Sequence, residues 1–577
     1  MAGYTACLAH LSDVERDTYL TGLSPGADID HRGTPFTEQL LRSLLGALLD
    51  PATRLPCLGA SRFGFATFTG RADFGSATFR GGVDFESATF QDEALFKEAN
   101  FLDGAWFGSA VFESTNGFSS ATFHRQAWFA YATFRKDAQF PAASFGDAVF
   151  ARAVFQESAL FPFVTFKEEV AFYACTLQGD ARFDASTFQG SVGFHGTTCE
   201  GDASFEGAVF EQPVTLGPLM CAGRVSLSRA MFSGPASVEL AAHRLECWRT
   251  RWLSTAELRL RHATVDLSQS VLEHPLTIAS EPALFTFFDE QPLTEELLAN
   301  SLGNTVRLES LRGVDTAHLV LSDLDLSRCL FAGAVHLDQL RLEGNCTFAS
   351  VPPGRRWRRG LPLWFTPRRT LAEEHHWRAS RPGGVRGWNA AEGNSRIGPL
   401  QLAPIYRALR KSFEDGKHEP GAADFYYGEM EMRRHAEDIP RGERALLRAY
   451  WLLSGYGMRA SRALVWLAAA MVVTITLLMA FGLPQESPKQ QATGVVPPGG
   501  GRVTLEIDKD DPQNPTGDRF TGRRFERALN VTLNSVVFRS SGQDLTTAGT
   551  YIEMTSRLLE PALLAFAVLA VRGRVKR

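Results

Sequence analysis

The sequence lacks the motifs with which most enzymes hold their reactive groups. It contains no glycine-rich phosphate loop, no G-x-S-x-G nucleophile turn and no H-E-x-x-H zinc helix. Cysteine and histidine also do not occur together at a spacing known from nucleophilic catalysis. We therefore expect no enzymatic activity, no cofactor and no metal site.

Cysteine is sparse and dispersed, with eight residues in 577 and no C-x-x-C pair. This spacing argues against a disulfide framework and against a zinc site, and it is typical of buried apolar fillers in a reducing compartment. The N-terminus has no basic start followed by an apolar run, so no signal peptide is expected.

Phenylalanine, in contrast, is abundant and regularly spaced. From Phe63 to Leu216 a large apolar residue, nearly always Phe, recurs every five or six positions, and a small residue such as Ala66 precedes it by two. A helix would scatter this period around its axis, and a flat strand requires a period of two. The first positions of this structural ladder are Phe63, Phe68, Phe74, Phe79, Phe85, Phe90, Phe96, Phe101, Phe107, Phe112, Phe118, Phe123, Phe129, Phe134, Phe140 and Phe145.

The pattern fits a coil with four short sides, each contributing one unit of five or six residues. The Phe and the small residue before it point inward, and the positions between them face water. Two eleven-residue units make one turn of about 22 residues, and successive turns stack at the spacing of hydrogen-bonded strands, about 4.8 Å. Phe then lies above Phe along every side.

Segments such as Ala66-Thr67-Phe68, Ala88-Thr89-Phe90 and Ala121-Thr122-Phe123 resemble the pentapeptide-repeat proteins in their Phe-rich variant. The resemblance implies a mainly β fold, a right-handed quadrilateral β-helix, over residues 60–348. We expect regular coils over 60–216 and degenerate coils over 217–348. A helical insertion is expected at 281–304.

The segments around this domain predict helices. Residues 1–59 should form an N-terminal helical cap whose main helix begins near Pro35 and Thr37 and covers the open end of the first coil. An Arg- and Trp-rich connector follows at 349–400. Residues 401–462 then predict a helical hairpin, with helices at about 404–415 and 420–435.

The C-terminal part, 463–577, predicts a membrane region. Residues 463–483 are uncharged and long enough to cross a bilayer, and a shorter apolar stretch at 555–571 is predicted to be a second span, with the loop 484–554 between them. Arginines lie before the first span and after the second, which places the repeat domain and the C-terminus in the cytoplasm. We expect the bacterial inner membrane.

The order of span, loop, amphipathic segment and second span resembles a two-helix channel pore domain. Residues 525–538 occupy the place of a pore helix, and Thr547-Ala548-Gly549-Thr550-Tyr551 resembles the T-x-G-Y-G filter of potassium channels. The match departs at Thr550, where the filter has Tyr, and at Tyr551, where it has its final Gly.

Two polar groupings allow alternative interpretations. Glu373-Glu374-His375-His376 suggests metal ligands but has no zinc spacing, so a solvated polar segment is expected. The connector's tryptophans and arginines suit a membrane surface, single-stranded nucleic acid, or a cover for the last coil. They are Trp357, Trp364, Trp377 and Trp388 with Arg355, Arg356, Arg358, Arg359, Arg368, Arg369, Arg378 and Arg381.

These observations favour a membrane-anchored, non-enzymatic scaffold whose coil binds an unknown protein partner and whose spans contact membrane lipid. Nucleic acid is not an expected partner, and the oligomeric state stays open. One alternative is a channel or gated pore with a cytosolic coil. Another follows from the family resemblance, since some pentapeptide-repeat proteins mimic DNA and bind gyrase, and residues 61–216 carry nineteen Asp/Glu against ten Lys/Arg.

Overall fold

The structure is a computed structural model that describes residues 6–287, 291–298, 303, 305–352, 356–358, 361–363, 366–381, 387–389, 397–485, 490–494, 499, 506–509, 511–537, 539–540 and 542–575. The chain divides into two compact units. The first contains residues 1–397 and 407–418, and the second contains residues 398–406 and 419–577.

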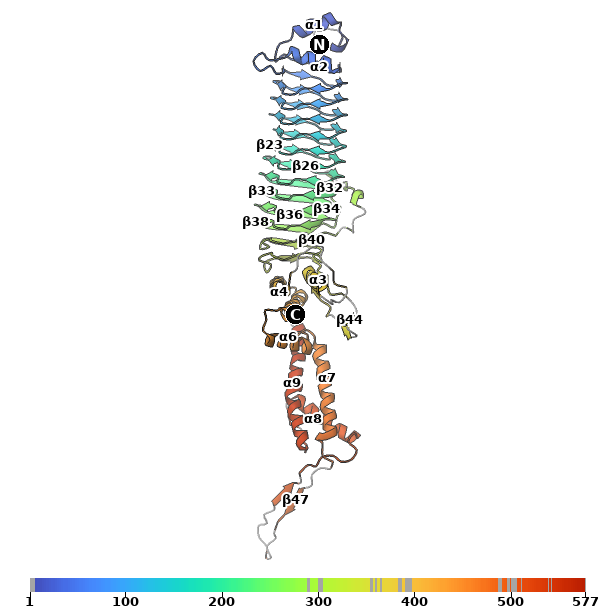
Figure 1. The fold of residues 1–577 in the computed structure, drawn as a ribbon, viewed down its shortest axis with the longest axis vertical. Coiled ribbons are helices and arrows are strands. Elements are labelled where there is room, and N and C mark those ends of the chain that lie inside the picture. Colours follow the sequence, from blue (N-terminus) through green and yellow to red (C-terminus); the bar gives the residue numbers. More distant parts are fainter. Residues whose placement is uncertain are drawn as a thin grey trace. The chain divides into compact units, whose positions relative to one another are not determined.

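The first unit is built around a parallel β-solenoid (Figure 1). Most of its strands are two residues long and fall into four columns, to which one coil contributes β5 (Thr67–Phe68), β6 (Ala72–Asp73), β7 (Thr78–Phe79) and β8 (Val83–Asp84). Each of these strands pairs in parallel with the strand four further along the chain, so that Thr67 lies beside Thr89. One column contains eleven strands, from β3 (Cys57–Leu58) to β38 (Val271–Leu272).

A tight turn produces the eleven-residue repeat. The amide of Ala66 donates to the carbonyl of Phe63 at 3.0 Å, and Phe65 between them has φ of +59°. The same positive φ recurs at Ser76, Ser87, Glu98, Ser109, Ser120, Tyr131 and Ala142. Because this turn leaves its first and fourth residues facing the interior, the chain needs Phe at one and a small side chain at the other.

The interior consists of stacked rings. Rings of the same column lie nearly parallel, as for Phe101 and Phe123, whose centroids are 4.5 Å apart at 2°. Rings of neighbouring columns meet edge to face, as for Phe85 and Phe96 at 5.7 Å and 79°. All sixteen ladder positions from Phe63 to Phe145 are at most 1% exposed. This arrangement matches the offset-stacked and T-shaped geometries that aromatic pairs prefer.

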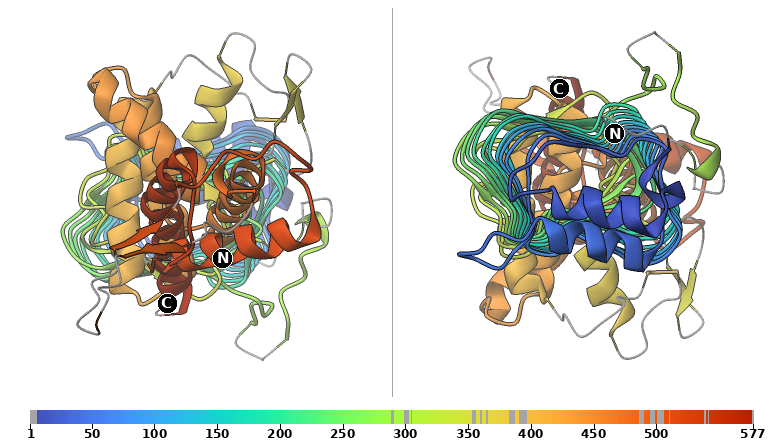
Figure 2. Two further views of the ribbon diagram at one scale, coloured as in Figure 1. Left: turned by 90° about the horizontal axis from the view of Figure 1, so that it is seen from below. Right: turned by 90° about the horizontal axis from the view of Figure 1, so that it is seen from above.

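Helices cover the first coil, as Figure 2 shows end-on. They are α1 (Asp13–Thr21) and α2 (Glu38–Ala47), and the Thr37 hydroxyl caps α2 by accepting from the amide of Leu40 at 3.2 Å. Strand pairing begins within the segment expected to form the cap: β1 (Ile29–Asp30) and β2 (Pro35–Phe36) pair with β4 (Ser61–Arg62) and β5.

The coils change beyond Phe210, where longer strands appear and the first two of them each replace several short ones. The longer strands are β32 (Val214–Ser226), β34 (Ala236–Glu246), β36 (Ala256–Arg261) and β39 (Leu276–Ser280). The ring stack ends at Trp252, whose ring lies 4.3 Å from that of Phe232, and aliphatic side chains fill the later coils. All eight cysteines are free, and burial raises the pKa of Cys175 and Cys247.

The insertion at 281–304 differs from the expected helix. In its described residues the only helical element is a three-residue 3-10 turn, η2 (Glu296–Leu298). Phe285, Leu293 and Leu298 pack on Met220 and Ala241 of the solenoid. The local sequence was helix-compatible, but the packing of these apolar side chains on a flat strand face determines the path of the chain.

Arg261 fastens the insertion to the solenoid. Its guanidinium donates at 2.8 Å to the carbonyls of residues 281, 282 and 283, and at 2.5 and 3.0 Å to the Glu295 carboxylate. The Arg261 side chain is only 5% exposed, so these bonds are screened little by solvent.

The solenoid continues through β40 (Arg307–Ser310), β41 (Leu319–Ser322) and β42 (Arg341–Glu343) and is followed by α3 (Ala372–Ala379). The expected hairpin corresponds to α4 (Pro399–Asp415), whose residues 407–415 belong to the first unit, and α5 (Glu419–His435). The second unit adds α6 (Arg441–Ser454), α7 (Ala460–Leu477) with a π-helical extension to Gly482, α8 (Gly522–Val536) and α9 (Thr547–Val575).

Two helical stretches of the second unit, Ala460–Gly482 and Thr547–Val571, are long and apolar enough to cross a membrane. The second is longer than the expected 555–571 because α9 begins at Thr547.

Replacing Phe107 with alanine should destabilise the solenoid by about 3–5 kcal/mol, because the ring stacks on Phe85 at 4.9 Å and on Phe129 at 4.7 Å and leaves a cavity when removed. Phe163→Ala is the matched control, since Phe163 is 67% exposed and should contribute less than about 0.5 kcal/mol. Amide hydrogen exchange followed by mass spectrometry should show faster exchange in the coils next to residue 107. Equal exchange in the two variants would contradict the stacked interior.

The N-terminal cap should lose stability in mild acid. His31 is 1% exposed, shares a hydrogen bond with the Tyr19 hydroxyl at 3.2 Å, and burial lowers its pKa to about 4. The folded cap therefore favours neutral His31, and its contribution is complete above pH 6.5 and is lost as pH falls toward 4. The loss should be roughly 2 kcal/mol at pH 5.

Thermal unfolding between about pH 7.5 and 5 tests this dependence when wild type and His31→Gln are compared. The neighbouring Asp30 does not interfere, because Arg32 lowers its pKa to about 2 and its contribution is lost only at lower pH. The variant should be less sensitive to acid than wild type. An equal pH dependence in both proteins would assign the acid sensitivity to other groups.

Candidate interaction surface of the solenoid

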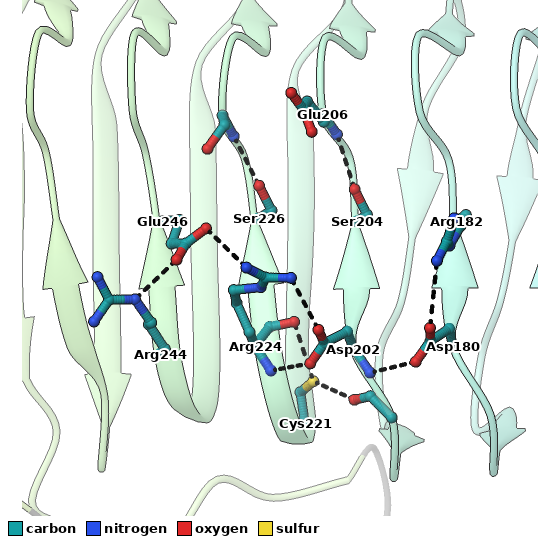
Figure 3. Close-up of polar contacts among 12 residues, drawn as sticks. Asp180, Arg182, Asp202, Ser204, Glu206, Cys221, Arg224, Ser226, Arg244 and Glu246 are labelled. Carbon is teal, nitrogen blue, oxygen red and sulfur yellow. Dashed lines mark hydrogen bonds and ion pairs between the residues drawn. The ribbon is translucent and has the colours of Figure 1, made fainter.

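A line of acidic and basic side chains runs along one side of the solenoid (Figure 3). Asp180, Asp202, Arg224 and Arg244 lie on successive coils, just before β26 (Ala181–Arg182) and β30 (Ala203–Ser204) and within β32 and β34. Asp180 Oδ1 accepts the amide of Asp202 at 3.1 Å, and Asp202 Oδ1 accepts the amide of Arg224 at 2.8 Å. Carboxylates thus extend the hydrogen-bond ladder from one coil to the next.

The guanidinium groups join these coils into one ion-pair chain. Arg224 contacts Asp202 at 3.1 Å and Glu246 at 3.5 Å, and Arg244 contacts Glu246 at 2.9 Å and Glu309 at 2.7 Å. The Arg224 side chain is 51% exposed, so each pair contributes at most about 1 kcal/mol to stability. The arrangement presents ion-paired charges in a row along one side of the solenoid, which suits recognition by another surface.

The segment Glu373-Glu374-His375-His376 lies on α3, and the expectation of a solvated segment was wrong. Glu373, Glu374 and His375 are at most 5% exposed. Glu373 Oε1 accepts the amides of Phe331 and Ala332 at 2.5 and 3.1 Å, which satisfies backbone donors of a late coil. Burial raises the pKa of Glu373 and lowers that of His375 to about 4.

Glu374 has a different role from its neighbour. Its carboxylate is fully buried and accepts from Arg368 at 2.5 and 2.7 Å and from Arg378 at 2.6 Å. Two guanidinium groups therefore compensate one buried carboxylate. In the described part of the chain, no three His, Cys, Asp or Glu side chains are grouped so that they could hold a metal ion.

The Trp- and Arg-rich connector is described only in part. Arg355, Arg359 and Trp364 lie outside the described residues, and so do the side chains of Trp357, Arg356 and Arg358. Among the described ones, Arg378 lies over the rings of Trp377 and Trp388, with centroid distances of 5.4 and 4.9 Å, and Arg381 lies 4.9 Å over Trp377. These contacts pack arginine and tryptophan against each other around α3.

The filter-like segment Thr547–Tyr551 forms the first turns of α9. A helical backbone uses its carbonyls in helix hydrogen bonds, so the segment does not present the row of free carbonyls that a potassium filter requires. Gly549 instead permits close packing, since a Cβ there would overlap the backbone of Gly482 at the end of α7. The Thr546 hydroxyl donates to the carbonyl of Phe481 at 2.7 Å beside this contact.

One polar pair connects the two apolar helices. The Thr474 hydroxyl of α7 donates to Glu560 Oε1 of α9 at 2.8 Å, and Glu560 is fully buried. Sequence reasoning missed this pair, as well as the carboxylate of Glu373 on the late coil. For Glu560, the only available signal in the sequence was the unusual position of an acidic residue within an apolar stretch.

The comparisons with known proteins identify the repeats of the solenoid. Residues 96–144 and 161–209 match a family model described as pentapeptide repeats, in nine copies. No curated protein and no solved structure matches the chain.

Substitution by glutamine should distinguish the roles of the two neighbouring glutamates of α3. Glu374→Gln should lower the free energy of unfolding by about 3–5 kcal/mol, because it leaves buried guanidinium groups uncompensated. Glu373→Gln removes the same charge but keeps an acceptor for the two amides, and burial already disfavours the Glu373 anion, so stability should change by less than about 1 kcal/mol. Denaturant titration measures both; equal losses would contradict the separate roles.

Proposed function

Because the chain carries a pentapeptide-repeat solenoid, we propose that it is a membrane-anchored, non-enzymatic interaction scaffold. The observation that carries the proposal is the stacked, mainly aromatic interior. It holds the outward side chains of the solenoid in fixed rows, one coil apart, along flat walls. Such a surface can recognise a protein partner without rearranging, which reduces the entropic cost of binding.

The two apolar helices α7 and α9 support membrane anchoring. Their outer surface carries exposed Val465, Val472, Leu558 and Leu569, while the polar pair Thr474–Glu560 is turned inward. This is the distribution expected of two helices in lipid, where polar groups must find partners inside the protein. The exposed apolar side chains would be unfavourable in water.

Arginine distribution supports the orientation. Arg444, Arg448 and Arg459 precede the first apolar helix and Arg462 lies in its first turn, and positively charged residues favour the cytoplasmic side of a membrane. We therefore place the solenoid and the C-terminus in the cytoplasm of a bacterial cell, at its inner membrane. The helical conformation of Thr547–Tyr551 gives no support to the alternative of a conducting pore.

Arginine substitutions within the first apolar helix test the anchor. Val465 and Val472 are 68% and 62% exposed, so Val465→Arg with Val472→Arg leaves the inner packing of the two helices unchanged. The charge at Val472, near the centre of the span, costs about 2.5–3.5 kcal/mol of insertion free energy, and the charge at Val465, nearer its start, costs less. Wild type should stay in the membrane pellet after extraction at alkaline pH, and the double variant should be released or degraded.

The matched control is Leu446→Arg, which adds a charge at an exposed position of α6 outside the apolar stretches, where Leu446 is 71% exposed. This variant should remain with the membrane. Release of the wild-type protein by alkaline extraction would refute the anchor, because lipid-embedded helices resist this treatment.

A further inference from the structure

Two tryptophans stand out on the water-facing positions of the solenoid. In the four strand columns of the regular coils these positions hold mostly Thr, Ser, Asn and Val, but β12 (Ala105–Trp106) and β16 (Ala127–Trp128) place a tryptophan outward on successive coils of one column. Trp106 is 40% exposed and Trp128 is 37% exposed. Two partly exposed indoles on adjacent coils form a larger exposed apolar surface than a single side chain, which favours a binding surface.

The backbone is shaped to hold both rings flat. A Cβ on Gly82 or Gly104 would lie 2.7 or 2.8 Å from the Trp106 ring, so only glycine leaves room for this indole. Trp128 leans the other way, and a Cβ on Gly108 would lie 3.3 Å from its ring. The two indoles therefore cover the face towards opposite edges, on a rigid support.

Carboxylates border the rings. Asp84 is the strand partner of Trp106 on the preceding coil, and its Oδ1 accepts the amide of Glu86 at 2.8 Å. Asp84 is also the strand partner of Arg62 and interacts electrostatically with Arg32, but within the described chain neither Asp84 nor Glu86 lies close enough to a cation to form an ion pair. Tyr131, three residues after Trp128, is 57% exposed, and the Arg152 guanidinium carbon lies 5.9 Å from its ring centroid. We call Asp84, Glu86, Trp106, Trp128 and Tyr131 the tryptophan face.

We infer that the tryptophan face binds a polypeptide segment through its lysine or arginine side chains. This inference deepens the proposed scaffold function and rests on it. Electron-rich indole rings attract a cationic group over their faces, and the two carboxylates add charge complementarity. Exposed Trp and Tyr on a rigid support are typical of binding hot spots. The excess of acidic residues over 61–216 steers a basic segment toward the solenoid and disfavours nucleic acid.

The test uses the full-length protein in detergent micelles and titrates it with a hexa-arginine peptide, followed by calorimetry and tryptophan fluorescence. Hexaglutamate and cellohexaose serve as comparison probes. We expect hexa-arginine to bind and the other two not to bind. Trp106→Ala with Trp128→Ala should weaken binding at least about ten-fold, while Phe163→Ala, which removes an exposed ring at 67% exposure, should leave it within about two-fold.

A second pair of variants separates the face from general electrostatic attraction. Asp84→Asn with Glu86→Gln and Glu168→Gln with Glu200→Gln remove the same charge, and none of these four carboxylates forms an ion pair in the described coils. Only the first pair should weaken hexa-arginine binding about ten-fold or more and reduce its salt dependence. Circular dichroism should show that all variants keep the wild-type fold.

Two results would overturn the inference. One is equal hexa-arginine binding by wild type and the double tryptophan variant, which would leave only diffuse charge attraction. The other is tryptophan-dependent binding of cellohexaose without binding of hexa-arginine, which would make the face a sugar site. Both are distinguishable from failure of the proposed function, because the alkaline extraction experiment reports on the anchor independently of the tryptophan face.

Discussion

The structure depends on the agreement between two distances. Hydrogen-bonded strands lie about 4.8 Å apart, and stacked aromatic rings in the solenoid lie at nearly the same separation, for example 4.8 Å between Phe90 and Phe112. A single distance between successive coils therefore allows both the backbone hydrogen bonds and the stacking of the rings. Replacing one of these stacked rings with a smaller side chain would leave a cavity in the interior. The straight walls and the fixed outward rows follow from this agreement.

Because the coils stack through strand pairing, the first and the last coil each expose unpaired strand edges. The chain solves this problem in two chemically different ways. At the first coil, apolar side chains of α2 such as Leu41 and Leu44 are buried, and His31 lies edge-on to the ring of Phe36. At the late coils, the carboxylate of Glu373 accepts backbone amides, and the buried Glu374 holds two arginines in place.

How much of the structure could be predicted from the sequence depends on how far apart in the sequence the contacting residues lie. The Phe ladder was predictable because each coil repeats the same turn, so the pattern itself states which residues face inward. The role of Glu373 was not predictable, since its partners are the amides of Phe331 and Ala332, some forty residues away. The long strands after Val214 and the irregular insertion likewise depend on contacts between distant residues. Thr547–Tyr551 resembled a filter by composition, but its glycine serves a helix contact with Gly482.

Function should therefore be sought on the outward rows, whose side chains the interior leaves free to vary. Pulsed electron paramagnetic resonance on spin labels at these positions measures the central claim directly. Thr78 and Thr165 lie on the same column and are separated by four coils, through Asn100, Thr122 and Ser144. Labels there should be about 19 Å apart, and moving the second label by one coil should change the distance by about 4.8 Å. Broad distances that do not scale with the number of coils would contradict the stacked solenoid.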